Sequence, residues 1–125
     1  ARFDVRTSGP QQTARTLSGG NLQKFAIGRE IAQSPNVLVA AQPTWGVAAA
    51  AAATVHRALI ALADAGTAVL VISQDLAELR SLSHRLAVLS DGRLSVARPT
   101  AELSIAEIGA LMGGHSLEGS IHATA

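Results

Sequence analysis

Two short apolar runs constrain the fold of this chain more than any other feature of its sequence. Residues 37–40 lie between Pro35 and Pro43, and residues 67–72 follow a glycine, so both runs have the length and flanks of strands. The apolar residues are continuous rather than alternating with polar ones, which is typical of strands buried on both faces of a parallel sheet. We therefore expect both faces of these strands to be covered.

Segments with the apolar spacing of helices separate and follow the two runs. They are residues 19–33, an alanine-rich stretch that ends at Asp64-Ala65-Gly66, and residues 75–82. Strands that alternate with helices predict an α/β layer with crossover connections. Before them, residues 1–16 are expected to form an edge strand followed by a loop.

A different pattern is predicted after residue 84. Residues 85–89 read as a third strand, and the Asp91-Gly92 turn folds it back onto residues 94–97 as a hairpin. Ser104 and Glu107 fit a capping box that opens a last helix through Met112, before Gly113-Gly114. Residues 115–125 are expected to be a flexible tail.

Charge and composition exclude several classes of function. The formal net charge is +1 and the ten Lys and Arg residues are scattered among nine acids, so no nucleic-acid surface is indicated. No cysteine is present, which excludes disulfides and Cys-based zinc sites. The four histidines lack metal-ligand spacing, and Asp75 and Glu78, one helical turn apart, are interpreted as a solvated helix start.

The stretch LSGGNLQK, residues 17–24, allows two interpretations. Ser18 with Gly19 and Gly20 can place a hydroxyl and unpaired backbone N–H groups at the start of a helix, which suits a phosphate. Serine is also a common N-cap, and glycine pairs often precede helices. Taken by itself, this stretch leaves both interpretations open.

The order of further motifs supplies the context. LSGGN is followed by VLVAAQPT, WGVA and VISQD. In this order they resemble the signature motif, Walker B segment, D-loop and switch segment of an ATP-binding cassette (ABC) domain. The resemblance runs from about residue 3 to residue 114, and the variants LSGGN and QPTWG most resemble the second cassette of two-cassette importer subunits for simple sugars and nucleosides.

The resemblance implies the C-terminal part of a P-loop NTPase domain, a mostly parallel sheet flanked by helices and ending in a β-hairpin and a helix. Residues 1–114 would form a partial nucleotide-binding domain, with 115–125 as the tail. The only lysine is Lys24, so the chain contains no P-loop G-x-x-x-x-G-K-[ST].

The chain departs from the family at four positions. Ala41 and Gln42 stand where the family carries the Mg²⁺-supporting aspartate and the water-polarising glutamate, Ala48 replaces the D-loop aspartate, and Gln74 replaces the switch histidine. A glutamine amide can orient a water but cannot accept its proton. The resemblance therefore implies a half-site that does not hydrolyse nucleotide, and we expect the isolated chain to be inactive.

The resemblance also implies which residues act. Cassettes pair head to tail, so Ser18, Gly19, Gly20 and Asn21 would contact an ATP bound by a partner cassette. The D-loop residues Trp45, Gly46, Val47 and Ala48 would line the interface. ATP would lie across the cassette dimer interface, with Mg²⁺ held only through the partner half-site.

Implied partners are another cassette, in the same full-length chain or in a dimer, membrane permease subunits and, indirectly, a solute-binding lipoprotein, with no nucleic acid. The implied location is peripheral, at the cytoplasmic face of the membrane. Two alternatives stay open: a non-catalytic truncated cassette that acts as an interaction module, and a fragment of an ABC ATPase that does not serve transport.

Overall fold

A computed structural model describes residues 3–115 and 123–124 of the chain. The chain divides into two compact units, Ala1–Leu76 and Ala77–Ala125, which are described separately. Within the described residues, no helix is both long enough and apolar enough to cross a membrane.

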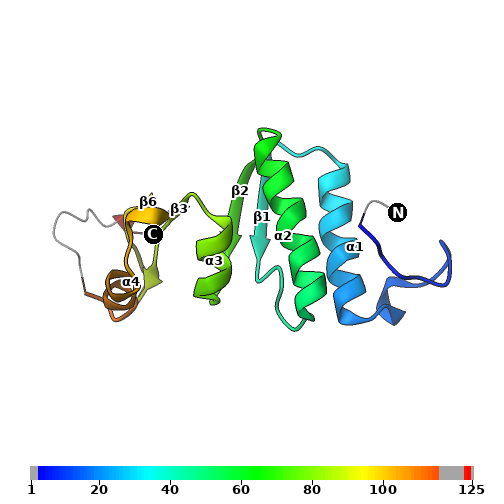
Figure 1. Cartoon of the computed structure of the whole chain (residues 1–125), viewed down its shortest axis with the longest axis horizontal. Coiled ribbons are helices and arrows are strands. Elements are labelled where there is room, and N and C mark those ends of the chain that lie inside the picture. Colours follow the sequence, from blue (N-terminus) through cyan, green and yellow to red (C-terminus); the bar gives the residue numbers. More distant parts are fainter. Residues whose placement is uncertain (1–2, 116–122, 125) are drawn as a thin grey trace. The chain divides into compact units, whose positions relative to one another are not determined.

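The first unit contains two helices and a pair of parallel strands. Its elements are η1 (Ala14–Thr16), α1 (Gly19–Ala32), β1 (Val37–Ala41), α2 (Ala49–Asp64) and β2 (Ala68–Ile72). Strands β1 and β2 pair in parallel, with Val39 opposite Leu70, and α1 packs against α2 (Figure 1). Apart from the expected amino-terminal edge strand, the predicted helices and strands of this unit are confirmed, within two residues at most boundaries.

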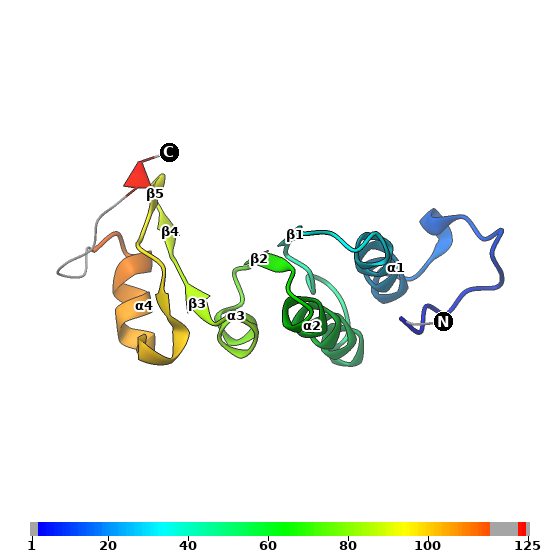
Figure 2. The same cartoon turned by 90° about the horizontal axis from the view of Figure 1, so that it is seen from above.

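The two strands of this unit are buried on one face only. Leu38 and Ala40 are buried, as are Val55, Leu59 and Leu62 of α2, which lies on one side of the strands (Figure 2). On the other face Val37, Val39, Leu70 and Ile72 are 51–63% exposed. The prediction of burial on both faces is therefore wrong for this structure, because the described helices of the unit cover a single face.

The amino-terminal segment also differs from its prediction. The described residues between 3 and 13 form no strand, and the 3-10 helix η1 follows them. Instead of pairing with a strand, Phe3 packs against the backbone of α1 at Gly28. Phe3 thus serves packing on a helix.

The second unit combines short antiparallel strands with two helices. Its elements are α3 (Leu76–Leu82, which begins at the unit boundary), β3 (Arg85–Leu86), β4 (Leu89–Ser90), β5 (Arg93–Leu94), β6 (Arg98–Pro99), η2 (Thr100–Glu102), α4 (Ile105–Met112) and β7 (Ala123–Thr124). β3 pairs with β6, while β5 pairs with both β4 and β7. Buried Leu86, Val88, Leu103, Ile108 and Leu111 form the core.

Two local predictions for this unit are confirmed. Asp91 and Gly92 both have positive φ, 48° and 73°, as a two-residue hairpin turn between β4 and β5 requires. Ser104 and Glu107 form the capping box of α4. Bonds from the backbone N–H and hydroxyl of Ser104, together with Arg98, lower the pKa of the Glu107 carboxyl below its ordinary value.

Other predictions for this unit are corrected. The single strand expected at 85–89 is divided into β3 and β4, which pair with different partners, and the strand expected at 94–97 is limited to Arg93–Leu94. Most of the predicted tail, 115–125, lies outside the described residues, although Ala123–Thr124 forms β7. The class predicted from the sequence, α/β with a parallel pair and a terminal hairpin and helix, agrees with the structure.

Candidate functional site

The predicted phosphate-binding residues lie at the start of α1. Ser18 is the N-cap residue, with extended backbone angles (φ −62°, ψ 155°), but its side chain does not cap the helix. Its Oγ instead accepts a hydrogen bond from Asn21 Nδ2 at 3.0 Å. Among the described residues, none accepts a hydrogen bond from the backbone N–H of Gly19, Gly20 or Asn21. These donors therefore point from the positive end of the helix dipole with no bond to the described chain.

The structure brings the predicted D-loop next to this helix start. A Cβ at Gly19 would lie 3.9 Å from the carbonyl oxygen of Gly46, and a Cβ at Gly20 would lie 3.3 Å from Ala51 Cβ in the first turn of α2. The second contact is tight, so the packing of α2 favours glycine at position 20. The first turns of α1 and α2 are therefore neighbours, with Gly46 between β1 and α2.

Gly46 and its neighbours form two successive turns. Trp45 N donates to the carbonyl of Gln42 at 3.2 Å and Val47 N donates to that of Thr44 at 3.3 Å. Gly46 has a φ of 70°, which favours glycine. Trp45 is 73% exposed and Ala48 is the N-cap residue of α2. The indole of Trp45 therefore lies on the surface of its unit rather than over its core.

The positions where the family carries catalytic groups meet at one edge of the parallel pair. Ala41 ends β1, the backbone N–H of Gln42 donates to the Ile72 carbonyl at 2.7 Å, and Gln74 follows β2 by two residues. Parallel strands place their carboxyl ends at the same edge, which is where α/β proteins bind ligands. Gln42 is held at a φ of 49°, a left-handed conformation that is uncommon for a residue with a side chain.

This edge has few groups capable of acid–base chemistry. Between Glu30 and Asp64 the sequence contains no acid. Asp75, an exposed residue directly after Gln74, is the carboxylate nearest to the edge in sequence, and sequence reasoning assigned it only to a helix start. The two glutamine amides can donate and accept hydrogen bonds, but neither they nor the alanine supply a Mg²⁺ carboxylate or a general base.

The remaining titratable candidates are the histidines and the pair Asp75 and Glu78. Within the residues that the structure describes, no group of three or more His, Asp and Glu side chains could hold a metal ion. His56, His84 and His115 are among those residues, whereas His122 lies outside them. Glu78 is only 5% exposed, so the prediction that it lies on a solvated helix start is wrong.

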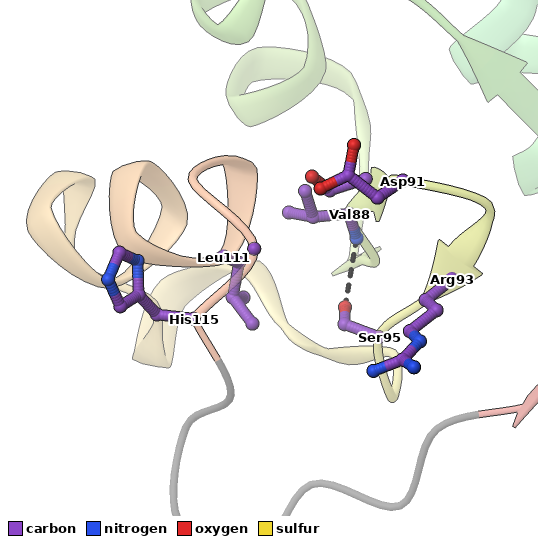
Figure 3. A pocket seen from close by; sticks show the side chains of 8 residues that line it. Val88, Asp91, Arg93, Ser95, Leu111 and His115 are labelled. Atoms are coloured by element: carbon purple, nitrogen blue, oxygen red, sulfur yellow. Dashed lines mark hydrogen bonds between the residues drawn. The ribbon is translucent and has the colours of Figure 1, made fainter.

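The second unit contains a cavity of about 240 Å³ that sequence reasoning did not predict. Its lining includes Asp91, Arg93 and Ser95 from the hairpin region and Leu111 and His115 from the end of α4 (Figure 3). Ser95 Oγ already accepts from Val88 N at 2.9 Å, and Ser90 Oγ donates to the Met112 carbonyl at 3.0 Å. These two hydroxyls join the hairpin to its surroundings.

Comparison with known proteins identifies relatives of the chain by sequence. No protein-family model matches the chain. Over 112 residues the chain is 47% identical to the guanosine import ATP-binding protein NupO of Bacillus subtilis (strain 168), which covers 90% of this chain and 22% of the relative. Over 115 residues it is 42% identical to the nucleoside import ATP-binding protein NupA of Lactococcus lactis subsp. cremoris, which covers 92% and 23%. The chain thus spans less than a quarter of the length of these relatives.

A solved structure is similar in fold. It is the crystal structure of an ATP-binding cassette of an ABC transporter in its ADP conformation, which matches with a TM-score of 0.59 and 24% sequence identity. The match covers 78% of this chain and 37% of that one. At this level of identity the likeness concerns the fold.

Proposed function

We propose that the chain is a portion of an ABC-type ATP-binding cassette, because it is similar to nucleoside and ribose import ATP-binding proteins and shares the fold of a cassette. We propose further that it serves ATP-driven import of a nucleoside or a simple sugar. In this proposal residues 1–114 act as part of a nucleotide-binding domain. The domain pairs with another cassette and with permease subunits at the cytoplasmic face of the membrane.

The observation that carries the proposal is the contrast between two groups of residues in the first unit. At the start of α1, Ser18 and the N–H groups of Gly19 and Gly20 fit the oxygens of a phosphate. At the carboxyl edge of β1 and β2, Ala41, Gln42 and Gln74 offer no carboxylate for a metal ion or a water. We propose that this chain contributes to one ATP site and leaves the other without hydrolysis.

Each residue then has a defined task. The Ser18 hydroxyl and the N–H groups of Gly19 and Gly20 donate hydrogen bonds to the terminal phosphate of an ATP seated on the partner cassette. Residues Trp45–Ala48, beside them, line the surface between the cassettes. Bound ATP and Mg²⁺ supply the phosphoryl group and its charge neutralisation, and the Mg²⁺ ligands come from the partner, because this chain lacks them at its own edge.

The exposed face of the parallel pair fits the same proposal. Parallel sheets are covered on both faces in folded domains. Here Val37, Val39, Leu70 and Ile72 form an apolar face without cover from the described residues. We propose that further parts of a complete cassette pack on it, since the structural neighbour contains much chain beyond the matched region.

A segment exchange tests the proposal. The matching stretch of NupO would be replaced by this chain, and ATP turnover and guanosine uptake would be measured in a strain that lacks NupO. Ser18→Arg places a long cation against the phosphate site and should reduce turnover by roughly 100-fold, as loss of a transition-state donor does. Gln42→Ala should change it by less than about twofold, because the amide is no general base.

A matched control separates charge from position. Gln11→Arg adds the same cation at an exposed residue upstream of η1, and we expect turnover close to that of the unsubstituted exchange protein. Equal turnover with and without Ser18→Arg would contradict the role of Ser18. A large loss with Gln42→Ala would contradict the assignment of a silent half-site.

A further inference from the structure

Residues 3–6 lie along α1, and we call this segment the strap. A Cβ at Gly28 would lie 2.6 Å from Phe3 Cδ2, so the Phe3 ring rests directly on the helix backbone there. One turn earlier in the helix, Lys24 Nζ donates to the Asp4 carbonyl at 3.2 Å and lies 3.7 Å from Asp4 Oδ2. The strap therefore runs antiparallel to α1 (Figure 1).

The helix positions that receive the strap lie on one stripe. Residues 21, 24 and 28 are spaced three and four apart, which places them on one face of a helix. Lys24 is the only lysine of the chain, and its side chain is 13% exposed although it is charged. Burial of its stem under the strap explains this low exposure. The stripe therefore has a packing partner along two turns.

The last residue of the strap bonds to Asn21, which in turn bonds to the serine of the LSGGN stretch. Arg6 N–H donates to Asn21 Oδ1 at 3.0 Å, and Asn21 Nδ2 donates to Ser18 Oγ at 3.0 Å. The Asn21 amide is thus fixed at both of its polar atoms. A serine hydroxyl has one proton and two acceptor lone pairs, so the bond from Asn21 occupies a lone pair and leaves the proton available.

We infer that Asn21 is a positioning residue, locked by the strap, that turns the Ser18 hydroxyl so that its proton points away from the helix toward an incoming phosphate oxygen. Without Asn21 the hydroxyl is free to donate to other acceptors. The inference rests on the proposed function for its purpose. Its geometry, however, can be measured without nucleotide or partner.

The test replaces the hydroxyl by a group that reports its hydrogen bonds. Because the chain contains no cysteine, Ser18→Cys introduces a single thiol. A helix start and a donated hydrogen bond both favour the thiolate and lower the pKa of the thiol. The thiol pKa is read from the pH dependence of its alkylation by iodoacetamide in the 125-residue chain.

Removal of the Asn21 amide is the first comparison. In the Ser18→Cys background, Asn21→Ala should raise the thiol pKa by about one unit and slow alkylation near neutral pH roughly tenfold. Gln23→Ala is the matched control, since the Gln23 amide makes no hydrogen bond within the described residues, and it should leave the rate unchanged. Equal thiol pKa values with and without Asn21→Ala overturn the inference.

Release of the strap is the second comparison. Phe3→Ala leaves Asn21 and Ser18 intact but removes the ring that holds the strap on Gly28. Phe3→Ala should also raise the thiol pKa, by about half a unit, and it should slow alkylation near neutral pH roughly threefold. If circular dichroism shows that Asn21→Ala lowers the helix content, the inference is judged on Phe3→Ala instead. An unchanged thiol pKa in the Phe3→Ala variant then overturns the inference. Failure of the exchange experiment on turnover, by contrast, bears on the proposed function alone.

Discussion

The Gly28→Ala substitution tests the packing of the strap by setting two effects of opposite sign against each other. Gly28 is buried inside α1, and its Cβ would lie 2.6 and 2.9 Å from Cδ2 and Cγ of Phe3. Such contacts do not occur between real atoms, so the ring must leave its place. At the same time, alanine is the best helix former and glycine one of the worst.

The two effects are similar in size. Alanine in place of glycine stabilises a helix interior by about 0.8–1 kcal/mol. Displacement of the half-buried Phe3 ring forfeits about 1–1.5 kcal/mol, half of the value for full burial. We therefore expect Gly28→Ala to lower the free energy of unfolding by no more than about 0.7 kcal/mol in the unsubstituted chain. In the Phe3→Ala background, where no ring opposes it, the same substitution should stabilise by about 0.8–1 kcal/mol.

The assay is urea unfolding of the four proteins of this double-mutant cycle. The coupling energy between positions 3 and 28 should be about 1–1.5 kcal/mol. A gain of about 1 kcal/mol from Gly28→Ala in both backgrounds would refute the reasoning, because it would mean that Phe3 does not rest on α1 in solution.

Three further substitutions test other parts of the structure. Gln42→Gly relieves a left-handed backbone and should stabilise by about 0.5–1 kcal/mol in thermal unfolding, whereas Gln42→Ala should not. The pKa of Glu107 is lowered in the fold, so its stabilisation is present above the ordinary carboxyl pKa of about 4.3 and is lost as the pH falls through the lower folded value. The stability difference between the natural chain and Glu107→Gln should therefore shrink below about pH 4, and a constant difference in acid titrations of unfolding would contradict this. Leu70→Lys places a charge on the exposed face of the parallel pair and should reduce dye binding and aggregation of the isolated chain, while Leu59→Lys, at 2% exposure, should unfold it.

Local rules predicted much of the fold from the sequence. The helical spacing between residues 19 and 33, the Asp91-Gly92 turn and the Ser104/Glu107 capping box each depend on residues within one or two turns, and all agree with the structure. Long-range outcomes were predicted less well. The expected edge strand near Phe3 and the solvated position of Glu78 were wrong, because both depend on what packs against them.

For the candidate site, too, the sequence predicted some features and left others to the tertiary structure. The order of LSGGN, QPTWG and VISQD marked Ser18, Gln42 and Gln74 by sequence alone, and their roles stay predictions. The chain has no P-loop and no carboxylate at positions 41 and 42, and this is a matter of composition that no packing can alter. The sequence by itself therefore determined which chemical groups are available.

Only the tertiary structure decided how those groups are held. The hydrogen bonds from Arg6 to Asn21 and from Asn21 to Ser18 join residues 15 and 3 positions apart, and the first of them exists only because the strap folds back along α1. The close approach of Gly46 to Gly19 likewise depends on α2 packing beside α1. Spacing along a chain fixes which side of a helix or strand a residue occupies, but which surface covers that side depends on contacts between segments far apart in sequence.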